Sequence, residues 1–364
     1  MTAARRRLPV VVMRGGTSKG VFVREDDLAS TGPERDRMLL ALMGSPDPMQ
    51  LDGLGGGHSS TSKVVSVARS DRPDSDVEYL FAQVAVDRAL VDWAGNCGNL
   101  TTAVGPYAIE EGLVAPTEPV TTVRLYNRNT NVRVLAHVPV VDGRVLTQGD
   151  CVVAGVPGTG APIVTEYLDP AGAVLGSLLP TGRPCDAVTL AGGGPVPVSL
   201  VDVAGPVAFA RAADVGLDAT LDPGSANADA RLLERLEATR AACAVLAGLA
   251  PDEASARTAS PALPRLALVV KGPDGADVAV RVVSMQRVHH ACPMTVLLCT
   301  AAATLVPGTI PNGVASGAVG DVVRIAHPKG ASEACVRFDA AGGLRSVSVT
   351  RTARRLLAGE AYLR

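Results

Sequence analysis

Two stretches decide the fold prediction: "NCGNLTTAVGPYAIEEG" at 96–112 and "ACPMTVLLCTAAATLVPG" at 291–308. Each places a cysteine, Cys97 or Cys292, before an Ala-rich, largely apolar segment of helical length that ends near a glycine. A helix that is apolar on most of its sides belongs inside a core rather than on its surface. Two such helices, each flanked by strand-like runs, therefore predict two similar β-rich halves, each surrounding a central helix.

The regions around these helices are typical of strands. Short Val-rich runs, which favour β structure, occur at 10–13, 21–24, 64–68, 79–86, 120–126 and 132–140. The central helices are expected at 100–111 and 295–305, and further helices at 33–44 and 228–249. The chain is thus predicted to be α+β, with an N-terminal half at 1–182 and a C-terminal half at 183–342. A C-terminal strand and helix at 343–364 can pack back on the N-terminal half.

Composition excludes several classes of protein. The net charge of −2 and the lack of a basic stripe argue against nucleic-acid binding. No segment approaches the roughly 20 apolar residues of a membrane span, and the apolar stretch 8–13 is too short for a signal peptide. Seven cysteines without a CxxC pair fit neither a disulfide framework nor a zinc site. We expect a cytoplasmic protein with no metal, membrane or nucleic-acid partner, and a homodimer stays open.

Three Gly-rich polar stretches are candidate binding loops: "MRGGTSKG" at 13–20, "DGLGGGHSSTSKV" at 52–64 and "GNCGN" at 95–99. Clustered glycines let backbone N–H groups approach a ligand closely, and successive N–H groups can bind anions. Arg14, Lys19 and Lys63 add positive charge. Any one of these stretches alone could be an ordinary turn, but together they indicate a site for a small substrate with several carboxylates.

Other interpretations of these motifs are weaker. "GGGHSSTSK" is similar to a P-loop, but the G-K-[ST] order is absent and a strand is expected after Lys63. Ser60 and Lys63 fit the S-x-x-K motif of penicillin-recognising enzymes, but its S-D-N and K-T-G partners are missing, which leaves a Ser/Lys hydrolase as a minor alternative. The adjacent His289 and His290 should point to opposite sides of an extended segment, which favours a structural or substrate-contacting pair over a metal site.

Cys97 has the surroundings of a reactive thiol. The N-terminus of a helix carries a partial positive charge, which lowers the pKa of a cysteine there below its free value of about 8.5. Lys63, in a pocket of glycines and serines, can act as a base if burial or neighbouring cations lower its pKa. A lysine and a cysteine on either side of an acidic C–H can move a proton, while N–H groups stabilise the enolate. This chemistry requires no cofactor.

Several motifs together identify a family resemblance. The strings "VVMRGGTSKGVFV", "LDGLGGGHSSTSKVVSV", "WAGNCGNLTTAVGPYAIEEGLV", "HHACPMT", "LVPGT" and "VTRTARRLLAGEAY" resemble the PrpF family, in the family's order and over essentially the whole chain. The resemblance implies a diaminopimelate-epimerase-like fold, with two pseudo-symmetric β-roll or barrel halves and the active site between them. It also implies a cofactor-independent isomerase that catalyses 1,3-proton shifts or cis–trans isomerisation. Its substrates would be unsaturated di- or tricarboxylic acids such as aconitate, 2-methylaconitate, methylitaconate or 4-oxalomesaconate.

The resemblance also implies roles for individual residues. Lys63 would be the principal acid/base residue, with Cys97 as its partner or a substrate contact. The substrate pockets would be lined by Arg14, Thr17, Ser18, Lys19, Gly57, Ser59, Ser60, Ser62, Asn96, Gly98 and Asn99 from the first half and by His289 and His290 from the second.

Two features keep other functions open. Cys292 occupies the position equivalent to Cys97, so a two-cysteine racemase or epimerase of the same fold is an alternative, although Pro293 replaces the open glycine. Gly205 stands where a family-like D-x-x-N-P motif would have asparagine, which weakens the transfer of any particular substrate. A non-catalytic carboxylate-binding accessory protein is a further alternative.

Overall fold

The computed structural model describes residues 6–93, 95–190, 194–218, 222–284, 286–316 and 320–363. The chain divides into two compact units, one comprising Met1–Glu166 and Thr350–Arg364 and the other Tyr167–Val349. Both divisions fall at strands, β11 (Ile163–Leu168) and β20 (Leu344–Arg351). The boundaries expected after 182 and 342 therefore differ from those of the structure, because strands rather than a Gly/Pro-rich linker carry the chain from one unit to the next.

The first unit holds most of the predicted site. Its strands are β1 (Arg6–Gly15), β2 (Ser18–Arg24), β3 (Lys63–Arg69), β4 (Val77–Val84), β5 (Val91–Asp92), β6 (Val120–Asn127), β7 (Val132–Val141), β8 (Arg144–Val145), β9 (Cys151–Val152), β10 (Thr159–Gly160) and β21 (Ala353–Leu363). Its helices are the short 3-10 helix η1 (Glu25–Asp27), α1 (Pro33–Met43) and α2 (Gly98–Glu110).

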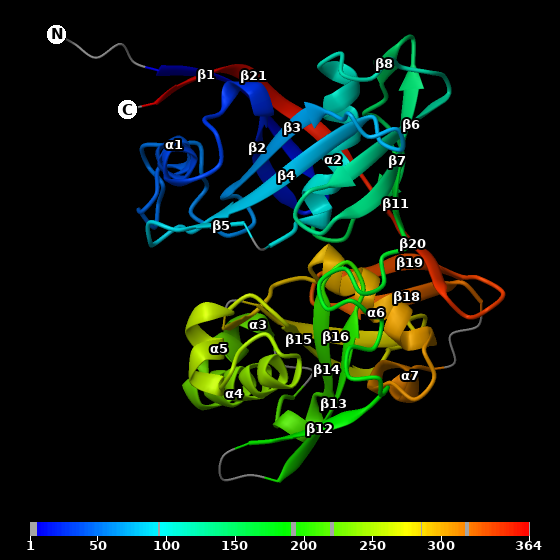
Figure 1. Ribbon diagram of the computed structural model, residues 1–364. Helices are drawn as coiled ribbons and strands as arrows, with labels where there is room; N and C mark the ends of the chain where they lie inside the picture. Colours follow the sequence, from blue (N-terminus) through cyan, green and yellow to red (C-terminus); the bar gives the residue numbers. More distant parts are fainter. Residues whose placement is uncertain are drawn as a thin grey trace. The chain divides into compact units, whose positions relative to one another are not determined.

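The central helix of this unit is α2, as its apolar composition predicts. Strands β1, β2, β3, β6, β7 and β21 all contact α2 (Figure 1). All of its residues from Gly98 to Ile109 are buried. A second apolar layer packs Met38, Leu39 and Leu42 of α1 against the other face of β1 and β2. The first unit is therefore a β-roll around α2, with α1 on its outside.

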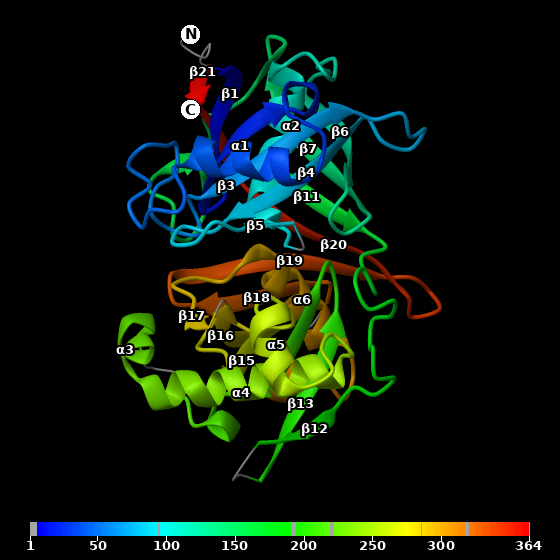
Figure 2. The same ribbon diagram turned by 60° about the vertical axis from the view of Figure 1, so that its left-hand side comes forward.

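The second unit repeats this plan and adds helices. Its strands are β12 (Asp186–Thr189), β13 (Pro195–Asp202), β14 (Pro206–Arg211), β15 (Arg265–Lys271), β16 (Val278–Ser284), β17 (Arg287–Val288), β18 (Val322–His327), β19 (Gly330–Phe338) and β20. Its helices are η2 (Ala213–Val215), α3 (Pro223–Ala228), α4 (Ala230–Leu246), α5 (Glu253–Ala259), α6 (Met294–Leu305) and α7 (Ile310–Val314). The central helix is α6, which contacts β13, β14, β18 and β19, whereas α4 and α5 lie outside these strands (Figure 2).

The strand ladders show that the two units have the same internal order. In the first, β1–β2 is antiparallel, β2–β3 parallel, β3–β4 and β4–β5 antiparallel, β4–β6 parallel and β6–β7 antiparallel. In the second, the series β13–β14, β14–β15, β15–β16, β16–β17, β16–β18 and β18–β19 has the same alternation of directions. The prediction of two similar β-rich halves around central helices is confirmed.

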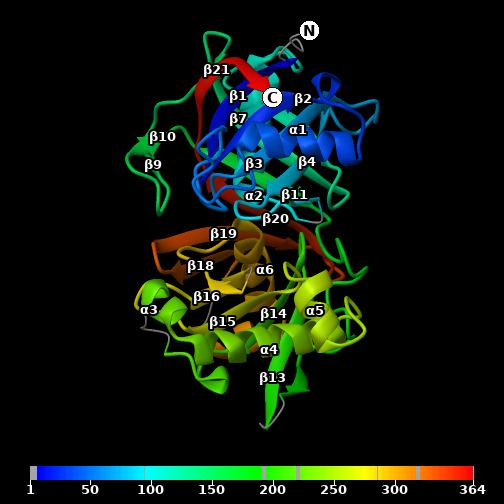
Figure 3. The same ribbon diagram turned by 90° about the vertical axis from the view of Figure 1, so that its left-hand side faces the viewer.

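The end of the chain differs from its prediction. Residues 353–363, where a short helix was expected after a strand, form the strand β21, which pairs antiparallel with β1 from Arg6↔Leu363 to Gly15↔Ala353 (Figure 3). The helix prediction was wrong because the sequence "ARRLLAGEAYL" has helix-forming residues, but β1 offers a row of backbone hydrogen bonds from the opposite end of the chain. Tertiary pairing of this kind overrides a weak local propensity.

Candidate functional site

The β1–β2 hairpin packs against the first turn of α2. Gly16 adopts a left-handed conformation with φ of +46°, and a Cβ added there would lie 2.1 Å from Asn99 Oδ1. A Cβ on Gly15 would lie 2.3 Å from the Asn99 carbonyl oxygen. Asn99 Nδ2 donates to Thr17 Oγ1 at 3.0 Å. The two glycines are therefore needed for close approach, and the loop "RGGTS" packs directly against α2.

Cys97 occupies the N-cap position of α2. Its Sγ is buried and donates to Ser18 Oγ at 3.6 Å, while its carbonyl oxygen accepts from Thr101 N at 3.0 Å. No side chain caps this helix end, so the first backbone N–H groups of α2 lie beside the thiol. Both polar atoms of the Asn96 side chain are buried and have no hydrogen-bond partner within the part of the chain that the structure describes. Such amide atoms are available to a polar ligand.

Lys63 is the first residue of β3 and only 9% exposed. Its Nζ donates to Gln83 Oε1 at 2.6 Å and lies 5.0 Å from the centre of the Phe81 ring. Gln83 is the residue directly opposite Lys63 in the β3–β4 ladder. Gln83 and Phe81 were not predicted from the sequence. Strands were predicted at 64–68 and 79–86, but only the structure shows that the two strands pair and bring these three residues together.

The serine-rich loop before Lys63 is fixed by buried hydrogen bonds. The Gln50 side chain, 1% exposed, donates to Ser62 Oγ at 2.6 Å and accepts from Gly57 N at 3.0 Å. Ser62 Oγ donates in turn to the Val84 carbonyl oxygen at 2.9 Å. Gly57 and Ser62 are thus structural members of the loop, and Gln50, which carried no motif signal, organises it. Ser59 is exposed.

Ser60 and Lys63 do not form the hydroxyl–amine pair of a Ser/Lys hydrolase as the side chains stand. Ser60 Oγ lies 2.9 Å from His58 Nδ1, and that same nitrogen accepts from Ser60 N at 3.1 Å. The Lys63 ammonium points to the amide of Gln83 instead. These contacts give the minor hydrolase alternative no support.

Arg14 and Lys19 lie directly opposite each other in the β1–β2 ladder, next to the Gly15–Ser18 pair. Because successive side chains on a strand point to opposite faces, they project away from the face on which Ser18 contacts Cys97. Arg14 Nη1 donates to the carbonyl oxygens of Gly16 at 3.2 Å and Thr352 at 2.7 Å. Its pKa is lowered by burial and by the neighbouring Arg354. The structure thus gives Arg14 a role in joining the hairpin to the C-terminal segment, and does not bring Arg14 and Lys19 together with Cys97.

In the second unit, the expected orientation of the histidine pair is wrong. The rings of His289 and His290 stack, with their centres 4.5 Å apart and their planes inclined by 20°. The chain bends after β17 instead of staying extended, and His289 Nδ1 lies 3.0 Å from both Ala291 N and Ala291 O. Cys292 is buried and its Sγ donates to the Pro293 carbonyl oxygen at 3.6 Å. Pro293, rather than Cys292, is the N-cap of α6.

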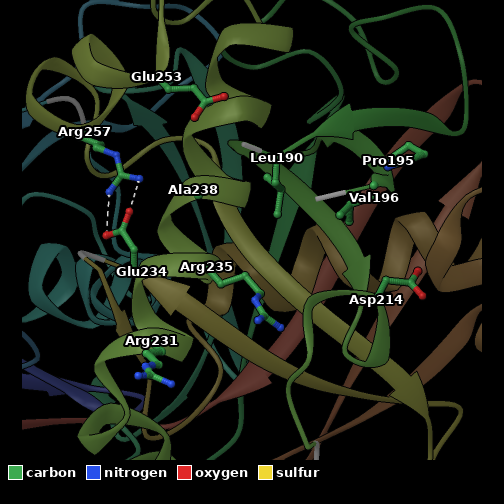
Figure 4. A pocket seen from close by; sticks show the side chains of 11 residues that line it. Leu190, Pro195, Val196, Asp214, Arg231, Glu234, Arg235, Ala238, Glu253 and Arg257 are labelled. Carbon is green, nitrogen blue, oxygen red and sulfur yellow. Dashed lines mark hydrogen bonds and ion pairs between the residues drawn. The ribbon is translucent and has the colours of Figure 1, made fainter. Parts of the chain in front are cut away.

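A hollow of about 560 Å³ in the second unit is lined by residues of α4, α5, η2 and the start of β13 (Figure 4). Its lining includes both acidic and basic side chains. Glu234 of α4 and Arg257 of α5 form an ion pair of 2.7 Å that joins the two helices. The predicted site residues of this unit, His289, His290 and Cys292, do not line it.

Two further features of the molecule concern metal binding and membrane insertion. Among the residues that the structure describes, no group of three or more His, Cys, Asp or Glu side chains is placed to hold a metal ion. Within the same residues, the helices are too short or too polar to cross a membrane.

Known proteins are similar in sequence to this chain over almost its whole length. The 3-methylitaconate isomerase of Eubacterium barkeri is 41% identical, with 98% of this chain and 97% of the relative aligned. The 4-oxalomesaconate tautomerase of Pseudomonas putida is 40% identical (97% and 95%), and the 2-methyl-aconitate isomerase of Cupriavidus necator 36% identical (97% and 96%). The expectation that the chain is an isomerase is confirmed, because these relatives are named isomerases or tautomerases.

Solved structures agree. A methylitaconate-delta-isomerase matches with a TM-score of 0.84 and 40% identity, covering 99% of this chain and 96% of that one. A hydroxyproline epimerase from Agrobacterium vitis matches with a TM-score of 0.59 and 13% identity, covering 99% and 94%, and shares the fold. The expected diaminopimelate-epimerase-like fold is confirmed. The family model described as PrpF protein matches residues 5–364, and the chain therefore belongs to the PrpF family.

Proposed function

We propose that this protein is an isomerase of an unsaturated di- or tricarboxylic acid, in which Lys63 and Cys97 move a proton between two carbons of an allylic system. The relatives named above are isomerases or tautomerases of such acids. The observation that carries the assignment to these residues is the place of Cys97 at the uncapped N-terminus of α2, in the unit that also buries Lys63.

The reaction requires no oxidant or reductant. A base removes a proton from the carbon next to the double bond, the electron pair moves across the three-carbon system, and a proton is delivered to the far carbon. The number of protons is unchanged over the cycle. Negative charge that develops on the substrate carboxylate is stabilised by the free N–H groups of the first turn of α2 and by its partial positive charge.

Six residues of the first unit have a part in this proposal. Cys97, at the start of α2, and Lys63 exchange protons with the substrate carbons. Ser18 contacts the thiol, Asn99 and Thr17 join the hairpin to the start of α2, and Asn96 supplies an amide for a carboxylate or carbonyl oxygen. The roles expected of His289 and His290 as substrate contacts, and of Cys292 as a second acid/base residue, stay predictions.

Proton NMR in D₂O tests the proposal. The wild type and Lys63→Met would be incubated with cis- and trans-aconitate, 2-methylaconitate, methylitaconate and 4-oxalomesaconate. Isomerisation of one acid, with deuterium entering the allylic carbon and with loss of turnover in the variant, supports the proposal. Binding without isomerisation of any of these acids would favour the accessory-protein alternative.

A further inference from the structure

We infer that Gln83 is a positioning residue for the reaction: its amide holds the Lys63 amine in place and ties it to the serine-rich loop. The inference rests on the proposed role of Lys63. Gln83 Oε1 accepts from Lys63 Nζ at 2.6 Å, and Gln83 Nε2 donates to the carbonyl oxygens of Ser62 at 2.9 Å and Ser59 at 3.1 Å. A single side chain thus joins the amine to two points of the loop that precedes it.

These contacts determine which way the amide faces. The oxygen accepts from an ammonium, and the two N–H bonds of the NH₂ group meet two carbonyl oxygens. If the amide were rotated by 180°, its NH₂ group would oppose the ammonium, and its oxygen would oppose both carbonyls. The environment therefore admits one orientation of the amide, and Oε1 presents a fixed acceptor to Lys63.

The loop to which Gln83 is attached is itself held by hydrogen bonds with Gln50. Ser62 is fully buried and held by Gln50 Nε2 at 2.6 Å, and Gln50 also accepts from Gly57 N at 3.0 Å. A chain of hydrogen bonds consequently runs from Gln50 through Ser62 and Gln83 to the Lys63 amine. The Phe81 ring lies on the same strand, 5.0 Å from Nζ, and further restricts the positions open to it.

A neutral amide suits an amine that must release and regain a proton. Glutamate at position 83 would form an ion pair with the ammonium and resist the loss of its proton. It would also place carboxylate oxygens against the carbonyls of Ser59 and Ser62. A methionine of similar size would fill the space but would form none of the three hydrogen bonds that Gln83 makes to Lys63, Ser59 and Ser62. The methionine variant therefore tests whether Lys63 must be held in position, and the glutamate variant tests whether the residue that holds it must be neutral.

Gln83→Met and Gln83→Glu should be compared with Gln148→Met, the same change at an exposed glutamine in the loop before β9. On the acid that the wild type isomerises, Gln83→Met is expected to lower kcat by about 10- to 100-fold, with KM changed less than about threefold. Gln83→Glu should lower kcat as well. A wild-type kcat in Gln83→Met overturns the inference, and a wild-type kcat in Gln83→Glu overturns the need for a neutral partner.

A second readout is independent of the substrate. The chain has four lysines, Lys19, Lys63, Lys271 and Lys329, so acetylation by acetic anhydride can be followed at each by mass spectrometry. Loss of a hydrogen bond to a charged group should speed the acetylation of Lys63 about tenfold in Gln83→Met, while the other three lysines keep their wild-type rates. Gln83→Glu should leave Lys63 slow.

The two readouts distinguish the possible failures. If no acid is isomerised but Lys63 acetylation rises in Gln83→Met, the proposed reaction fails while Gln83 is still shown to hold the amine. If Gln83→Met lowers the unfolding temperature and speeds acetylation of all four lysines alike, Gln83 only stabilises the fold and the inference is wrong.

Discussion

The two central helices begin beside the same kind of residue but in different surroundings. Cys97 is the N-cap of α2 and its thiol contacts the hydroxyl of Ser18, whereas Cys292 precedes the N-cap of α6 and its thiol donates to the carbonyl of Pro293. The strand order around the two helices is the same. The two helices therefore differ in where they begin relative to the cysteine and in which group the thiol contacts, and this difference underlies the proposal of Cys97 as the reactive thiol.

The strand registers extend this comparison to the lysine. Val64 pairs with Val21 on one side and Ala82 on the other, and Leu266 pairs correspondingly with Ala208 and Val283. The residue before each is Lys63 in the first unit and Arg265 in the second.

Arg265 cannot take over the proposed role of the lysine. Its Nη1 donates to Thr295 Oγ1 at 2.8 Å, on the first turn of α6. An arginine stays protonated in proteins, so the second unit has no group able to exchange a proton at this position. The same backbone plan thus carries the proposed acid/base residue in one unit and a permanent charge in the other.

The largest effect on kcat is expected when Lys63 of the first unit is replaced by arginine, the residue at the equivalent position of the second unit. Lys63→Arg keeps the positive charge but removes a proton that can be released, so kcat should fall by about 10²- to 10⁴-fold. Steady-state kinetics measure this, with Lys271→Arg, at an exposed position on β15, as the control. Activity near the wild-type level in Lys63→Arg would mean that charge alone is required.

A second test compares the two cysteines. Cys97→Ser should lower kcat by about 10²-fold or more, since a serine hydroxyl is a far weaker acid, whereas Cys292→Ser should change it less than about threefold. The measurement is proton exchange and turnover in D₂O for both variants. Equal losses in the two would support the two-cysteine racemase mechanism and contradict the assignment to Lys63.

A third test compares the hairpins that lie at equivalent places in the two units. Gly16→Ala combines a left-handed φ with a Cβ 2.1 Å from Asn99 Oδ1, so it should destabilise the protein by about 2–4 kcal/mol. Gly205, with φ of +139°, has no atom within 4 Å of an added Cβ, and Gly205→Ala should cost only roughly 1–2 kcal/mol. Denaturant unfolding of the two variants decides whether close packing causes the difference.

The smallest effect concerns Asp202, at the end of β13. Burial raises the pKa of this carboxyl, although Leu175 N and Val174 N donate to it at 2.6 and 2.8 Å. The unfolded chain therefore loses this proton at a lower pH than the folded chain, and stability falls as pH rises from about 4 through the folded pKa.

Asp202→Asn removes this titration. Relative to the wild type, its unfolding temperature should rise by a few degrees at most as pH increases from 4 to 8. Thermal unfolding across this range is the measurement, with the exposed Asp321→Asn as the control. A difference that is constant with pH would show that the folded carboxyl has an ordinary pKa.

Much of the fold, and candidates for the site, could be predicted from local pattern. The apolar composition of 100–111 and 295–305 indicated buried helices, because a helix without a polar face is stable only inside a core. The Gly-rich loop at 13–20 and the cysteine before the first helix indicated a site, because glycines and helix ends expose N–H groups to ligands.

Long-range pairing decided the rest. Gln83 lies 20 residues from Lys63 and meets it only because β3 and β4 pair in one register. Arg14 and Lys19 share the motif of Ser18 but project to the other face of the hairpin. Residues 353–363 became a strand because β1 offered hydrogen bonds from the far end of the chain. The amino-acid sequence by itself determined which segments are apolar and where glycines free the backbone. Only the tertiary structure decided which side chains meet, because register and face depend on partners distant along the chain.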